Sequence, residues 1–186
     1  MTAAMHSTLV FKTIKTKTIA AILAVAAAVA IPQLFHVLGA VSGLGTAPGE
    51  VFLPMHFAIF AVGFFAGPVA GGVAGALAPL VSFWLTAMPK APMLPFMMIE
   101  LCVYGLVTGL LANVKMPTLG KLLIAQVAGR AVRAGAILLG FYVFSSPIAP
   151  ATIWTSLLPG LPGLLLQWII LPLLVYRVAN AQNNDA

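Results

Sequence analysis

Charged residues are scarce in this chain. Only 6% of its 186 residues are charged, whereas 62% are hydrophobic, and ordinary soluble domains contain about 25% charged residues. A soluble domain of this length would need more charge to cover its surface. The chain also has one cysteine, which excludes an internal disulfide framework. The composition therefore predicts an integral membrane protein.

Acidic residues are the scarcest charged type, with three against nine bases. The bases are scattered over the ends of hydrophobic segments. Binding to nucleic-acid phosphates would need a clustered basic stripe, so we expect no nucleic acid as a partner. Because cytoplasmic loops of membrane proteins are enriched in Lys and Arg, the basic excess is instead a signal of topology.

Several catalytic and metal-binding motifs are also missing. The sequence has no Gly-x-x-x-x-Gly-Lys-Ser/Thr loop for ATP and no His-Glu-x-x-His or Cys/His cluster for a metal. It has no Gly-x-Ser-x-Gly nucleophile motif. We therefore expect no catalytic residue, metal or cofactor in this chain, and we favour binding and transport over chemistry. An intramembrane enzyme that acts on a lipid or prenyl substrate, or a standalone solute facilitator, stays open as an alternative.

Six hydrophobic segments are long enough to cross a bilayer, which takes about 20 residues in a helix. Backbone polar groups must be satisfied inside the bilayer, so each segment is expected to be helical. We predict an all-α integral membrane protein in which a compact bundle of six transmembrane helices forms a single domain. The expected spans are 18–38, 51–66, 68–87, 93–114, 119–144 and 152–178.

The basic residues predict the orientation of this bundle. With six spans, six bases fall on one side and Lys90 alone falls in a loop on the other side, so the positive-inside rule places both termini in the cytoplasm. The N-terminal segment 1–17 and the tail 179–186 are then cytoplasmic. The six bases are Lys12, Lys15, Lys17, Lys115, Lys121 and Arg177.

The first span has some features of a cleaved signal peptide, because a basic start leads into an apolar run with small residues at 26–28. A signal peptide would end its apolar run near the cleavage site. This run continues well past it. We therefore expect the first span to be retained.

Polar residues inside the predicted spans are the strongest functional signal. Gln126, Arg130 and Arg133 lie at i, i+4 and i+7, on one face of the fifth helix. Charges at membrane depth face a bundle interior or a water-filled site. Glu100 and Tyr104 share a face of the fourth helix. Counting from the outer ends, Glu100 and Arg133 can meet in the outer half of the bilayer, although the sequence leaves open which arginine pairs with Glu100.

Glu100 is the only acid within the predicted spans, so it can neutralise only one of the two arginines. A buried ion pair that merely clamps two helices is one interpretation. That interpretation leaves the second arginine unexplained, so we favour a site for a small anionic solute. The candidate binding residues are Glu100, Tyr104, Gln126, Arg130, Arg133, His56, Gln167 and Trp84.

The last three of these candidates are chosen because of their positions along the predicted spans. His56 lies near the outer start of the second span, although a histidine there is often an ordinary hydrogen-bonded interface residue. Trp84 lies near the outer end of the third span, where an interfacial aromatic belt is the alternative. Gln167 of the sixth span lies at a depth similar to that of Gln126.

Small residues repeat at four-residue spacing on three helices, a pattern that lets helices approach closely in lipid. Each repeat is either an internal packing seam or a face on which another subunit docks. We consider the first repeat the best docking candidate, because its helix carries no expected ligand contact. The repeats are Ala20, Ala24 and Ala28; Gly67, Gly71 and Gly75; and Gly105 and Gly109.

Several short motifs resemble those of the substrate-binding S components of energy-coupling factor vitamin transporters, across essentially the whole chain. The six short helices, the cytoplasmic termini and the alanine repeat are also similar. The motifs are Leu53-Pro54-Met55-His56 followed by Gly63, Met88-Pro89, and Glu100-Leu101-x-x-Tyr104-Gly105.

This resemblance implies a multi-pass protein in the cell membrane of a prokaryote, with an extracytoplasmic vitamin site built from helices four to six and the outer loops. It also implies docking through helix one on a transmembrane coupling subunit, which two cytoplasmic ATPases drive with ATP. The metal-uptake branch of this family has a histidine directly after the initiating methionine. In this sequence Met55-His56 is internal and His6 is displaced, so the resemblance does not favour uptake of nickel or cobalt. A pantothenate-like vitamin fits best, since its hydroxyl and amide groups suit Gln126 and Gln167, and cobalamin or another vitamin stays open.

Overall fold

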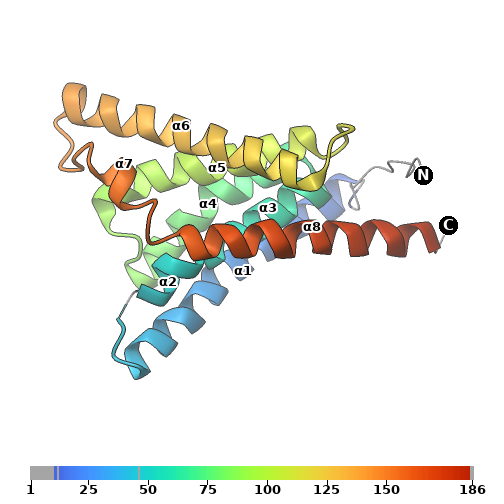
Figure 1. Ribbon diagram of the computed structural model, residues 1–186, viewed down its shortest axis with the longest axis horizontal. Coiled ribbons are helices and arrows are strands. Elements are labelled where there is room, and N and C mark those ends of the chain that lie inside the picture. The colour runs from blue at the N-terminus through green and yellow to red at the C-terminus, as the bar shows by residue number, and fades with distance from the viewer. Residues whose placement is uncertain (1–10, 12, 46, 185–186) are drawn as a thin grey trace.

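The computed structural model describes residues 11, 13–45 and 47–184, and the side chains up to 181. Most of the predicted N-terminal segment, including Lys12 and His6, and the end of the predicted tail lie outside this part. Every regular element described is a helix (Figure 1). In chain order these are α1 (Ile14–Val41), α2 (Ala47–Phe52), α3 (Pro54–Ala66), α4 (Pro68–Thr86), the 3₁₀ helix η1 (Ala91–Met93), α5 (Leu94–Leu111), α6 (Thr118–Phe144), α7 (Thr152–Thr155) and α8 (Leu161–Asn184).

Six stretches of this chain are helical, long enough and apolar enough to cross a membrane, which confirms the prediction of an all-α, multi-pass membrane protein. The second stretch combines α2 with α3, and the fourth combines η1 with α5. The stretches are Ile14–Val41, Ala47–Ala66, Pro68–Thr86, Ala91–Leu111, Thr118–Phe144 and Leu161–Ala181.

Proline interrupts two of the predicted spans. Leu53 separates α2 from α3 with a φ of 49°, and the residue before a proline, here Pro54, is disfavoured in the α conformation. The predicted sixth span began too early. Its helix α8 starts only at Leu161, because Pro159 and Gly160 lie between α7 and α8.

The two ends of the bundle carry different connections. Figure 1 shows the start of α1, the α5–α6 connection and the end of α8 at one end, and the α1–α2, α4–α5 and α6–α8 connections at the other. The first end carries Lys15, Lys115 and Arg177, and the second carries Lys90. These basic residues are therefore divided between the two ends of the bundle as a chain with six spans requires. That the lysine-rich end is cytoplasmic stays a prediction.

Glycines bring α4 and α5 into backbone contact. A Cβ atom added to Gly71 would overlap the backbone of Gly105, and one added to Gly105 would overlap that of Gly71. Gly75 lies equally close to the backbone of Leu101. Close packing of this kind holds helices together in lipid, where no hydrophobic force does so. The glycine repeats are thus internal seams that place Glu100, on the neighbouring turn of α5, inside the bundle.

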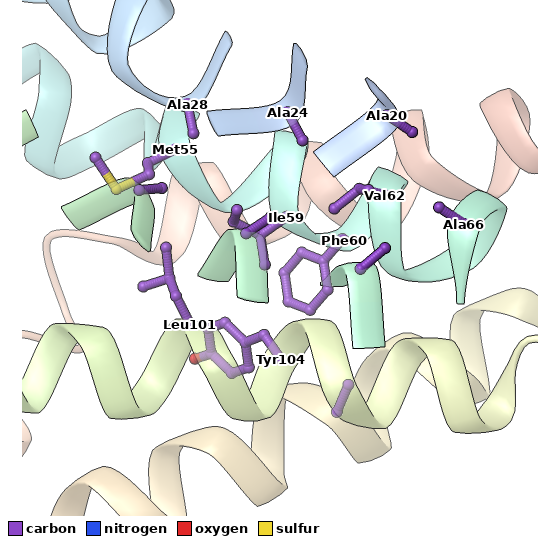
Figure 2. Close-up of a cluster of buried hydrophobic side chains, with 14 of the residues drawn as sticks. Ala20, Ala24, Ala28, Met55, Ile59, Phe60, Val62, Ala66, Leu101 and Tyr104 are labelled. Atoms are coloured by element: carbon purple, nitrogen blue, oxygen red, sulfur yellow. The ribbon is translucent and has the colours of Figure 1, made fainter. Parts of the chain in front are cut away.

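The alanine repeat of α1 also packs inside the chain. Ala20, Ala24 and Ala28 are 8%, 8% and 0% exposed, and Figure 2 shows them on the side of α1 that faces α3. A partner that docked on these three alanines would have to displace α3 or α4, so in this structure the repeat is an internal seam. The open face of α1 carries larger side chains such as Ile22 and Leu23.

Candidate solute-binding site

A cavity of about 430 Å³ opens at the end of the bundle that carries the α1–α2, α4–α5 and α6–α8 connections. Its volume lies within the range of small-molecule sites, about 300–1,000 Å³. Residues of α1 to α6 and of the connection between α6 and α8 line it, and α8 contributes none of the lining. The walls therefore come from more helices than the fourth to sixth spans that the family resemblance implies.

Glu100 and Arg133 form an ion pair at the bottom of this cavity. Arg133 Nη1 donates to Glu100 Oε2 at 3.1 Å, and the Tyr104 hydroxyl donates to Glu100 Oε1 at 2.7 Å. The Glu100 side chain is only 3% exposed and that of Arg133 is 14% exposed. The sequence left open which arginine pairs with Glu100, and the structure pairs it with Arg133, while Tyr104 supports the carboxylate from the same helix.

Arg133 has further partners besides Glu100. Its Nη2 donates to Ser156 Oγ at 3.2 Å and lies 3.7 Å from Met93 Sδ. The Ser156 hydroxyl in turn donates to the carbonyl of Thr152 at 2.7 Å. Arg133 thus joins α5 and α6 to the segment that follows α7. Its two terminal nitrogens are both engaged, whereas its buried Nε has no partner.

Arg130 and His56 have unused polar groups at the same cavity. Arg130 donates no hydrogen bond to any residue that the structure describes, and its Nε is buried without a partner. His56 is 5% exposed, and its buried Nδ1 also lacks a partner. Both residues line the cavity. Because buried polar groups are nearly always hydrogen-bonded in folded proteins, these two side chains can contribute to binding a ligand.

The charged residues around the cavity leave an excess of positive charge. Three cationic side chains, Lys90, Arg130 and Arg133, and two carboxylates, Glu50 and Glu100, are among the lining residues. Counting only these Lys, Arg and Glu side chains, the lining is one positive charge in excess, which a monoanion would neutralise. Lys90 and Glu50 are exposed, so the excess among the less exposed groups is two arginines against Glu100, and charges that are shielded from water need a counter-charge.

Arg130 and Arg133 also border a second, apolar groove of about 310 Å³ between α6 and the segment 153–157. Apart from the arginines, the residues of this groove are aliphatic except for Trp154, and Val127 and Trp154 are 67% and 70% exposed on the outside of the bundle. Apart from the two arginines and the indole of Trp154, the groove therefore offers no polar side chain to a solute. The larger cavity is the better candidate site.

Half of the eight predicted binding residues line this cavity, namely His56, Glu100, Arg130 and Arg133. Tyr104 reaches the site through its hydrogen bond to Glu100. Trp84 is 80% exposed, and it is not among the lining residues. Its place near the end of α4 is one where an interfacial aromatic side chain is common.

The two predicted glutamines contact each other instead of the cavity. Gln126 Nε2 donates to Gln167 Oε1 at 2.9 Å, and Trp168 Nε1 donates to Gln126 Oε1 at 2.7 Å. Gln126 and Gln167 are 4% and 0% exposed. Their polar groups therefore join α6 to α8 below the cavity, and they are not placed to meet a solute there.

Lining residues that the sequence reasoning missed include four methionines and Lys90. Met93 and Met97 lie at i and i+4 before Glu100 at i+7, so their position on its helical face was readable from the spacing. Met55 precedes His56, and Met88 lies in the α4–α5 connection. The sequence indicates only a topology signal for Lys90, yet Lys90 and its neighbours Met88 and Pro89 line the cavity.

No protein-family model, curated protein or solved structure matches this chain. Among the residues that the structure describes, no group of three or more His, Cys, Asp and Glu side chains could hold a metal ion. A guanidinium that donates no hydrogen bond to a described residue and a lining with an excess of positive charge meet at one cavity, an arrangement suited to an anion.

Proposed function

We propose that this chain is the solute-capturing membrane subunit of an ATP-driven vitamin uptake transporter, and that it binds a small monoanionic vitamin from the extracytoplasmic side. The proposal rests on the surroundings of Arg130. Arg130 is a cation at membrane depth whose Nε is buried without a partner and which lines a cavity of ligand size. Buried charges in membrane spans are costly and mark functional sites.

The neighbouring acid does not supply the missing counter-charge. Glu100 is engaged by Arg133 and by Tyr104 through different oxygens, and we expect a carboxylate of the solute to serve as the counter-charge of Arg130. Arginine binds carboxylates through two parallel hydrogen bonds, which are strong and geometrically specific. We expect His56, which lines the same cavity and has a buried Nδ1 without a partner, to hydrogen-bond a second polar group of the solute.

The carboxylate is the best-supported part of the ligand. Because Gln126 and Gln167 bond each other, the hydroxyl and amide groups of a pantothenate-like acid would meet other lining residues, such as Ser156 and His56. The proposal is therefore a vitamin with one carboxylate, and pantothenate is one candidate.

The remaining parts of the transporter are inferred from the motif resemblance. Energy would come from a transmembrane coupling subunit and two ATPases, since this sequence has no nucleotide-binding loop of its own. Co-purification of the chain with an ATPase pair from its native membrane tests this assembly. Isolation of the chain with no ATPase, together with solute flux in vesicles that hold this chain alone, would favour a standalone facilitator instead.

Binding of an acid compared with its neutral amide tests the anion site. Native mass spectrometry of the purified protein identifies any retained acid, and pantothenate serves as the first probe. In titration calorimetry, Arg130→Gln should weaken binding of the acid more than tenfold, because truncating one partner of a buried charge pair costs about 2–5 kcal/mol. Binding of the amide should change little.

Arg177→Gln is the matched control, since Arg177 is exposed near the end of α8, far from the cavity. It should leave both affinities as they are in the unaltered chain. Equal losses of acid and amide binding in Arg130→Gln would contradict the anion site and return Arg130 to a structural role.

A further inference from the structure

Methionine is concentrated at the cavity. The chain has eight methionines, and four of them, Met55, Met88, Met93 and Met97, line this one site. They come from α3, the α4–η1 connection, η1 and α5, so they surround the cavity from different sides. No Phe, Tyr or Trp is among the lining residues, although the chain contains 17 of these aromatic residues by composition: Phe 11, Trp 3 and Tyr 3.

One of the thioethers lies next to an arginine. Met93 at the end of η1 and Met97 and Glu100 of α5 follow one helical face by their spacing, and all three line the cavity. Met93 Sδ is 3.7 Å from Arg133 Nη2. On the opposite wall, Met55 precedes His56, and Figure 2 shows it at one end of the buried core cluster. A solute with its carboxylate at Arg130 would therefore have its body among sulfur atoms.

Thioethers are the most polarizable apolar groups of the wall. The other apolar lining residues are Leu53 and four prolines, and the aromatic rings among the described lining residues are the imidazoles of His36 and His56. Methionine sulfur makes favourable contacts with aromatic rings and adapts its shape to them. Where no Phe, Tyr or Trp is available for stacking, methionines on several sides can hold a ring instead.

We infer that the solute is an aromatic carboxylate, whose ring lies between the thioethers of Met55, Met88 and Met97 while its carboxylate reaches Arg130. This inference rests on the proposed function and narrows it to a ligand class. A cavity of about 430 Å³ has room for a fused or substituted ring. A saturated acid of the same size would gain the apolar contact without the attraction between sulfur and ring.

Two acids with one carbon skeleton test the inference. 2-Naphthoate and decahydro-2-naphthoate have the same number of carbons and the same charge, and only the first is aromatic. Their affinities are measured by titration calorimetry on the full chain and on Met88→Leu, Met97→Leu and the double variant. Leucine conserves the volume of methionine and removes the sulfur. Met93 is left unchanged because it contacts Arg133.

We expect each substitution to reduce naphthoate binding by about two- to tenfold, the range that a sulfur–ring contact corresponds to. Binding of the saturated acid should stay the same, since its apolar contacts are kept. Met98→Leu is the matched control, because Met98 is the next residue on α5 and does not line the cavity. It should change neither affinity.

The outcomes separate this inference from the proposed function. If Arg130→Gln weakens both acids while the methionine variants leave their ratio unchanged, the anion site stands and the thioether inference is wrong. If neither acid binds, or if Arg130→Gln affects neither, the anion site and the inference both fail. The single variants keep the test decisive if the double variant does not fold.

Discussion

The two arginines of α6 should differ sharply in what they contribute to stability. Arg133 is paired with Glu100 at 3.1 Å and bonded to Ser156 at 3.2 Å, whereas Arg130 donates no hydrogen bond to any described residue. Arg133→Gln would leave the 3%-exposed Glu100 carboxylate without its counter-charge. Arg130→Gln would remove a cation that has no partner to lose.

The expected magnitudes follow from these contacts. Removing one partner of a buried ion pair costs about 3–5 kcal/mol. The Tyr104 hydroxyl still donates to Glu100 at 2.7 Å in the variant, so we expect the lower end, about 3 kcal/mol, for Arg133→Gln. This corresponds to a roughly 150-fold fall in the ratio of folded to unfolded protein. For Arg130→Gln we expect a loss below about 0.5 kcal/mol, or a gain.

Unfolding in mixed micelles measures the difference. The fraction of sodium dodecyl sulfate is raised, the loss of packed helices is followed by circular dichroism, and no solute is present. Glu100→Gln and the double variant with Arg133→Gln complete a double-mutant cycle, in which the double variant should lose less than the two single losses together. Equal destabilisation by the two arginine substitutions, or a loss below about 1 kcal/mol for Arg133→Gln, would refute the division of roles.

Two further predictions concern the small-residue seams. Gly105→Ala should lower the free energy of unfolding by about 1–3 kcal/mol through overpacking against Gly71. Gly135→Ala, where an added Cβ has nothing within 4 Å, should be neutral or stabilising by up to about 1 kcal/mol; a similar loss in both variants would contradict the seam. Ala24→Trp should prevent α1 from packing, so that folded protein and solute binding are both lost in size-exclusion and binding assays, whereas Leu23→Trp on the open face should keep both. Normal folding and binding in Ala24→Trp with a loss of cellular uptake would instead support the docking role.

Much of the fold was predictable because transmembrane helices are local structures. Each helix satisfies its own backbone hydrogen bonds, so length and apolarity alone locate the span. Spacing along one helix likewise places Arg130 and Arg133 on a shared face. The missed breaks at Leu53 and Pro159 are places where prolines interrupt runs that remain apolar in composition.

The sequence by itself determined the class of the protein, its six spans and the shortage of acid inside them, because each depends on composition or on spacing within one segment. Only the tertiary structure decided that Glu100 pairs with Arg133, that Gln126 bonds Gln167, and that the alanines of α1 face α3. These facts depend on the rotation and depth of each helix relative to its neighbours. Contacts among all the helices set that rotation and depth, so the pattern of residues along one helix does not predict them.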